Sequence, residues 1–235
     1  FLAEASAILA SSLDYEVTLQ RVAQLAVPRV ADWCTVQVVE NGALSRVAVA
    51  HIDPAMVKLA QDYLARYPEK PREDRGLGRV LRTGEPEFVP AITEELLSAG
   101  IPDPEQRGML QRLGLTASIV VPLKSRGKVL GAIRLLASGE RRFREDDVRL
   151  GQDLARRAAA AIENAQLHRA VLEQENRFRL AHAAARMGAW SWDIVNGRMT
   201  WSDEFRELHG LTHNAASTEG AGPGLIYPDD RERVL

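Results

Sequence analysis

The residues whose types could support chemistry are few in this sequence, and they stand apart from one another. His51 lies alone between a Val- and Ala-rich run and an Asp-Pro pair. An imidazole at this position could ligate haem iron or hydrogen-bond a ligand, or it could cap the end of a strand. We favour the capped strand end, because a lone histidine shows no ligand spacing.

Cys34 is the only cysteine in the chain. One thiol excludes an internal disulfide and a multi-cysteine metal site, and it is too few for thiol–disulfide turnover. The carboxylate pairs Asp146-Asp147 and Asp229-Asp230 each open a predicted helix, where acids stabilise the positive end of the helix dipole. Neighbouring helical residues point in different directions, so these pairs predict no metal site. Since no nucleophile–base pair stands out, we expect no catalytic activity.

The composition is that of a globular protein, with 46% hydrophobic and 26% charged residues over 235 positions. The net charge is −2 and no long block of one sign occurs, which argues against binding to nucleic acid. No apolar run is long enough to span a membrane, and no signal peptide is visible. We therefore expect a cytoplasmic protein without membrane contact. Because the chain begins with Phe1 and ends within a pattern, we expect it to be a fragment.

Hydrophobic periodicity predicts two β-hairpins set among helices. The first hairpin turns at Asn41-Gly42, and this pair is a strong hairpin signal because a two-residue turn needs positive φ angles. One long helix follows the second hairpin, since the sequence from 145 to about 185 has no proline and a single glycine. The predicted helices are residues 1–11, 14–26, 53–67, 78–83, 104–113 and 145–185, and the predicted strands are 34–39, 44–51, 87–89, 117–123 and 129–136.

Several stretches resemble two families of signalling domain. ASIVVPLKSRGKVLGAIRLLAS (117–138) resembles the central hairpin of a GAF domain, and FREDDVRLGQDLARRAAAAIENAQLHRAV (143–171) resembles its closing helix. Residues 5–34 and 66–90 also resemble segments of bacterial GAF modules. Further along, RFRLAHAAARMGAWSWDIVNGRMTWSDEFRELHGL (177–211) resembles the start of a PAS domain, and IYPDDRERV (226–234) resembles its middle.

The resemblance implies an α+β fold in which a central antiparallel sheet carries helices on one face and loops with short helices on the other. A long C-terminal helix would then lead into an incomplete PAS-like segment. We assign residues 1–168 to the GAF domain, 169–186 to a helical linker and 187–235 to the truncated N-terminal part of a PAS domain. In related proteins such modules regulate a downstream output domain, which here would be a histidine kinase or a PP2C-type phosphatase outside this chain.

GAF domains hold ligands between one face of the sheet and the loops that cover it. In the first strand Cys34, Val36 and Val38 form an apolar face, which we expect to pack on the terminal helices. The alternate residues form a mixed face, which suits a binding pocket, although Gln37 and Arg134 could instead reach solvent at the rim. The candidate ligand-binding residues are Thr35, Gln37, His51, Tyr63, Ser118, Val120 and Arg134.

The sequence does not name a ligand. The Asn-Lys pair of cyclic-nucleotide-binding GAF domains is absent, and the Asp-Ile-Pro motif of bilin-binding ones appears only as Gly100-Ile101-Pro102. The cofactor is therefore unknown, and we expect none to be covalently bound. Two functions stay open: a module that senses a small molecule, and a structural GAF domain for dimerisation and signal relay without a ligand.

The long helix carries apolar and small residues at near-heptad spacing. We expect the part as far as Ala161 to pack on the GAF sheet, and the part beyond Ala165 to meet a partner. The spacing predicts a parallel homodimer through the helix 145–185. The residues of this stripe are Leu150, Leu154, Ala158, Ala161, Ala165, His168 and Leu172.

Overall fold

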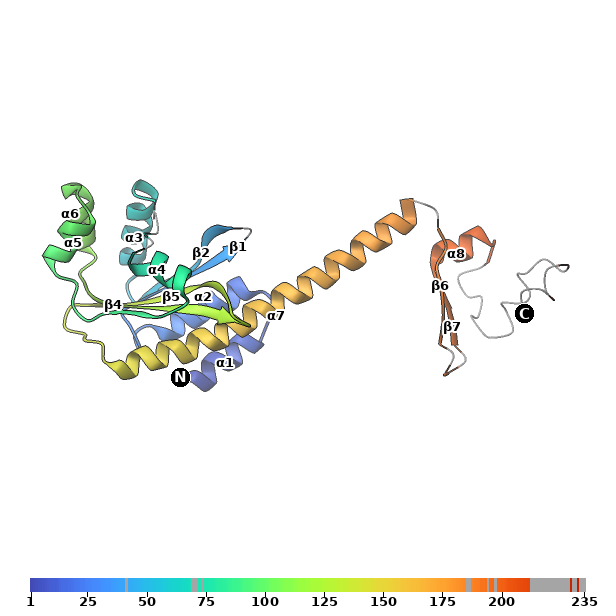
Figure 1. The fold of residues 1–235 in the computed structure, drawn as a ribbon, viewed down its shortest axis with the longest axis horizontal. Helices are drawn as coiled ribbons and strands as arrows, with labels where there is room; N and C mark the ends of the chain where they lie inside the picture. Colours follow the sequence, from blue (N-terminus) through green and yellow to red (C-terminus); the bar gives the residue numbers. More distant parts are fainter. Residues whose placement is uncertain are drawn as a thin grey trace. The chain divides into compact units, whose positions relative to one another are not determined.

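A computed structural model describes residues 1–40, 42–68, 72, 74–184, 187–193, 195–196, 198–211, 229 and 232. The chain divides into two compact units, Phe1–His168 and Arg169–Leu235. Each unit is described by itself, and the helix α7 (Glu145–Ala184) begins in the first and ends in the second (Figure 1).

The first unit is built on a five-stranded antiparallel sheet with strand order β2-β1-β5-β4-β3. Both predicted hairpins are present, and β1 pairs with β5 at the centre of the sheet. Asn41 lies outside the described residues, but Glu40 pairs with Ala43 where the first hairpin turns. The strands are β1 (Trp33–Glu40), β2 (Ala43–His51), β3 (Glu87–Val89), β4 (Leu115–Ser125) and β5 (Lys128–Ser138).

Helices cover both faces of this sheet (Figure 1). Helices α1, α2 and α7 pack against one face, where Cys34, Val36 and Val38 join the main hydrophobic core as the alternation predicted. Helices α3, α4 and α6 pack against the other face in two smaller clusters. The remaining helices of the first unit are α1 (Leu2–Ala10), α2 (Tyr15–Ala26), α3 (Pro54–Arg66), α4 (Gly76–Thr83), α5 (Glu94–Gly100) and α6 (Pro104–Arg112).

Side-chain caps fix where several helices begin. Asp14 accepts hydrogen bonds from the backbone amides of the first turn of α2, and Asp53 does the same for α3 ahead of Pro54. Helix α5 was not predicted, because its sequence is short and carries no clear apolar stripe. Thr93 caps it by accepting a hydrogen bond from the backbone N–H of Leu96.

A partly buried hydrogen-bond network lies beside the start of β1 and the end of β5. The carboxylate of Asp32 accepts from Arg141 Nε at 2.8 Å and from the Ser138 amide at 2.7 Å. Arg141 also donates to the carbonyl oxygen of Pro28 at 2.6 Å. These bonds tie the loop before β1 to the segment between β5 and α7.

The second unit contains a two-stranded antiparallel sheet, β6 (Trp190–Asp193) with β7 (Arg198–Trp201), followed by α8 (Asp203–Leu208). Trp190 and Trp192 are 59% and 46% exposed, whereas Trp201 is buried. Most of the PAS-like stretch 226–234 lies outside the described residues, so the assignment of this unit to a PAS domain stays a prediction.

At Gly131, the backbone of β5 leaves no room for a side chain beside β1. A methyl group there would lie 2.1 Å from the carbonyl oxygen of Gln37, whereas one on Gly108 of α6 would meet no atom within 4 Å. We expect Gly131→Ala to lower the free energy of unfolding by about 1–3 kcal/mol, because β5 would have to move away from β1. Gly108→Ala should raise it by up to about 1 kcal/mol, since alanine favours the helix.

Urea denaturation of the two variants measures both effects. Equal destabilisation by the two changes would contradict the close approach at Gly131.

Candidate functional site

A small cavity lies between the sheet and the helices α3 and α6. Its volume is about 80 Å³, and its wall combines leucines with two arginines and several other polar side chains. The mixed face of β1 forms its floor, while α3 and α6 close it from above. The residues that line it are Trp33, Thr35, Gln37, Arg46, Val49, Ala60, Tyr63, Leu64, Leu110, Leu113, Leu115, Arg134 and Leu136.

Two polar atoms of the lining residues have no hydrogen-bond partner among the described residues. They are Trp33 Nε1 and Thr35 Oγ1, and both are shielded from solvent. The whole Trp33 side chain is only 2% exposed. A buried donor without a partner costs about 1–3 kcal/mol, so such atoms are normally satisfied by water or a ligand.

Four of the seven predicted binding residues meet in this cavity. Thr35 and Gln37 come from β1, Arg134 from β5 and Tyr63 from α3. Arg134 lies opposite Thr35 in the β1–β5 ladder, which places both side chains on the same face. The Tyr63 hydroxyl accepts a hydrogen bond of 2.9 Å from Gln106 of α6, which joins the two helices above the cavity.

Ser118 and Val120 do not line the cavity. Val120 pairs with Arg134 and so shares its face, but it packs in a separate cluster with Leu77 and Val80 of α4. Ser118 pairs with Val89 of β3 on one side and with Leu136 on the other. The strand alternation thus gave the correct face, while the position of α4 divides that face.

His51 also lies outside the cavity. Its ring packs against Trp33 at a centroid distance of 4.2 Å, and its Nδ1 accepts a 2.9 Å hydrogen bond from the Asp53 amide. This is the capped strand end favoured by the sequence. The cavity thus excludes both His51 and Ser118.

Arg46 lines the cavity, but the sequence gave no sign of it. In the β1–β2 ladder Val36 pairs with Ala48 and Gln37 pairs with Arg46, so Val47 is an extra residue in β2. This bulge places Arg46 on the cavity face. A bulge has no residue signature that alternation alone would reveal.

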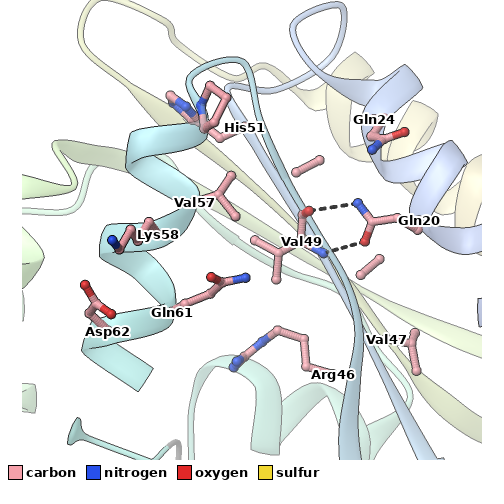
Figure 2. Close-up of a pocket in the computed structure, with 13 residues that line it drawn as sticks. Gln20, Gln24, Arg46, Val47, Val49, His51, Val57, Lys58, Gln61 and Asp62 are labelled. Carbon is pink, nitrogen blue, oxygen red and sulfur yellow. Dashed lines mark hydrogen bonds between the residues drawn. The ribbon is translucent and has the colours of Figure 1, made fainter. Parts of the chain in front are cut away.

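A second concavity, of about 900 Å³, lies beside β2 between α2 and α3 (Figure 2). It is an open groove rather than an enclosed cavity, and His51 lies at one end of it. Arg46 and Val49 line both the groove and the small cavity. In the groove, the side chain of Gln20 faces the backbone of Val49.

The described residues include neither a group of metal-ligating side chains nor a helix that could cross a membrane. Within the described ranges, no three His, Cys, Asp or Glu side chains are grouped so that they could hold a metal ion. Among the same residues, no helix combines the length and the apolar composition needed to cross a bilayer.

The GAF domain model matches residues 14–162 of this chain. The chain therefore belongs to the GAF domain family. The five-stranded antiparallel sheet with its helices is the α+β GAF fold that the resemblance in the sequence implied. The face predicted to carry only loops and short helices also carries the 13-residue helix α3.

Solved structures agree at the level of the fold. The GAF domain of a phosphoenolpyruvate-protein phosphotransferase from Coxiella burnetii has 20% sequence identity and a TM-score of 0.53, covering 72% of this chain and 94% of that one. The corresponding Acinetobacter domain has 15% identity and a TM-score of 0.50, covering 71% and 92%. A comparison with curated proteins found no match.

Cys34 lies inside the core on the opposite face of β1 from the cavity. It is fully buried, and burial raises the pKa of its thiol to about 12. Because the thiolate is the reactive form, we expect iodoacetamide at about pH 8 to leave Cys34 unmodified in the folded protein and to alkylate it after unfolding. Mass spectrometry of the intact chain measures the adduct. Rapid alkylation of the native protein would contradict the burial of this strand face.

Proposed function

We propose that the first unit is a sensory module of a bacterial multidomain signalling protein located in the cytoplasm. It binds a small organic molecule in the cavity above β1 and passes the change through α7 to an output domain. The membership in the GAF family supports a sensory or regulatory role. The observation that carries the ligand proposal is the pair of buried, unsatisfied polar atoms on Trp33 and Thr35.

The lining also defines the chemistry of this ligand. Arg46 and Arg134 contribute two guanidinium groups, and none of the described lining residues carries a carboxylate. The remaining wall is mostly apolar, and leucine is its commonest residue. A small molecule with an acidic group and an apolar body would satisfy the indole N–H and the hydroxyl while burying its own carbon surface. Because the cavity of about 80 Å³ is smaller than the roughly 300–1,000 Å³ of ordinary ligand pockets, α3 and α6 would have to move apart to admit it.

Thr35→Val tests this proposal, because it removes the hydroxyl and nearly keeps the volume. A thermal-shift screen of aromatic acids, amino acids, nucleotides and haem should yield a compound that raises the melting temperature of the wild type. We expect Thr35→Val to weaken the binding of that compound about tenfold, the worth of one hydrogen bond to a buried or charged group.

Thr116→Val is the matched control. Its hydroxyl is also buried without a partner among the described residues, but Thr116 does not line the cavity. It should leave binding unchanged. If no compound stabilises the wild type, or if both variants bind it equally well, the alternative of a relay domain without a ligand is favoured.

The relay proposal rests on the exposed apolar side chains of α7. Leu154, Ala158 and Ala165 of the predicted stripe are buried in the main core of the first unit. Because Ala165 belongs to this core, a charge there would disturb the GAF domain itself. Further along the helix the apolar side chains are exposed, at 49% for Leu167, 53% for Val171, 45% for Leu172 and 63% for Phe178.

We propose that a second copy of the chain covers this part of α7 in a parallel homodimer. Leu172→Glu should weaken the dimer at least tenfold, because it would place an unpaired charge in the interface. Ala170→Glu adds the same charge at a position that the heptad spacing places on the side of α7 away from the partner helix. This variant should have little effect on the dimer. Light scattering at micromolar concentrations measures the association. A wild type that stays monomeric, or variants that behave alike, would refute the dimer.

A further inference from the structure

The strand β2 forms an open edge of the sheet. It pairs with β1 on one side only, since β2 stands at the end of the strand order. Six consecutive residues of β2, from 46 to 51, line the groove beside it. Because neighbouring residues of a strand point to opposite faces, a groove that touches all of them runs along the strand edge and not over one face.

Gln20 of α2 occupies part of this edge. Its Nε2 donates to the carbonyl oxygen of Val49 at 2.9 Å, and its Oε1 accepts from the Val49 amide at 3.2 Å (Figure 2). A residue on a neighbouring antiparallel strand makes this same pair of bonds with the residue opposite. The side chain of Gln20 therefore takes the place of one peptide unit of a further strand.

We propose that the groove is a docking site for an extended peptide segment of a partner protein, which adds to the sheet beside β2 and displaces Gln20 from Val49. An open strand edge is a template for main-chain pairing, and strand addition is a common mode of peptide recognition. The proposal is independent of the small-molecule cavity, although Arg46 and Val49 border both sites.

The charges of the groove define the segment. In Figure 2 the side chain of Gln61 turns from α3 toward β2, and Val57 lies beside it, while Lys58 and Asp62 lie on the outer flank of α3. The side chains nearest the Val49 backbone, Gln20, Val57 and Gln61, are thus uncharged, while Arg46 brings a positive charge to the end of the groove opposite His51. A charged side chain brought next to Val49 would lose water without gaining a counter-charge, so the groove is complementary to a segment that is neutral at this position.

The shape of the groove argues against a second copy of the chain as the occupant. Strands pair at about 4.8 Å, and β2 lies at the bottom of a groove between α2 and α3. If two copies faced each other, their helices would meet before their β2 strands reached that distance. A single extended segment meets no such obstacle.

The first test uses an array of fluorescent, amidated octapeptides that alternate Val with Thr, Ser or Gln. Binding to the wild-type chain is measured by fluorescence polarisation. We expect Gln20→Ala to tighten the binding of the best octapeptide about tenfold, because the peptide then no longer competes with the side chain for Val49. Gln152→Ala, which removes an exposed glutamine of α7 that does not line the groove, should leave the affinity unchanged.

The second test shows whether the main chain is recognised. N-methylation of every other amide blocks one edge of an extended peptide. One set of methylated positions should abolish binding and the alternate set should leave it intact. The proposal is overturned if no octapeptide binds either protein, or if both methylated sets bind alike. It is also overturned if Gln20→Ala self-associates in light scattering without binding any octapeptide, since a second copy would then be the occupant.

Discussion

The alternation of side chains along β1 is the constraint on which the rest of the first unit depends. This strand lies between β2 and β5, so each of its side chains must enter one of the two layers packed on the sheet. Cys34, Val36 and Val38 enter the core shared with α1, α2 and α7. Trp33 and Thr35 enter the cavity instead. A shift of one residue would exchange the two sets and destroy both layers.

The two layers have opposite energetic roles. The layer beneath the sheet is apolar and closely packed, and it supplies most of the burial that stabilises the domain. The layer above contains buried polar atoms without partners, which cost about 1–3 kcal/mol each. The apolar layer stabilises the fold despite this cost. A ligand that formed hydrogen bonds with the unpaired atoms would recover the cost.

The edge strand β2 connects the two concavities of the unit. Its bulge at Val47 places Arg46 toward the cavity, and Val49 lies between the cavity and the groove. Gln20 satisfies the backbone of the same Val49 from α2. The cavity wall and the strand edge therefore share one short piece of chain, while α7 contacts the sheet through a different layer.

The sequence by itself determined most helices and strands of the first unit, although not α5, and it determined the faces of the strands. Apolar periodicity, the caps at Asp14 and Asp53 and the two hairpins require only local interactions, and all of them are present. Tertiary structure decided which residues meet. The bulge that brings Arg46 into the cavity and the position of α4 that separates Val120 from it depend on packing between distant segments. The hydrogen bonds between Gln20 and Val49 also depend on such packing, because a contact between distant segments produces no periodic pattern in the sequence.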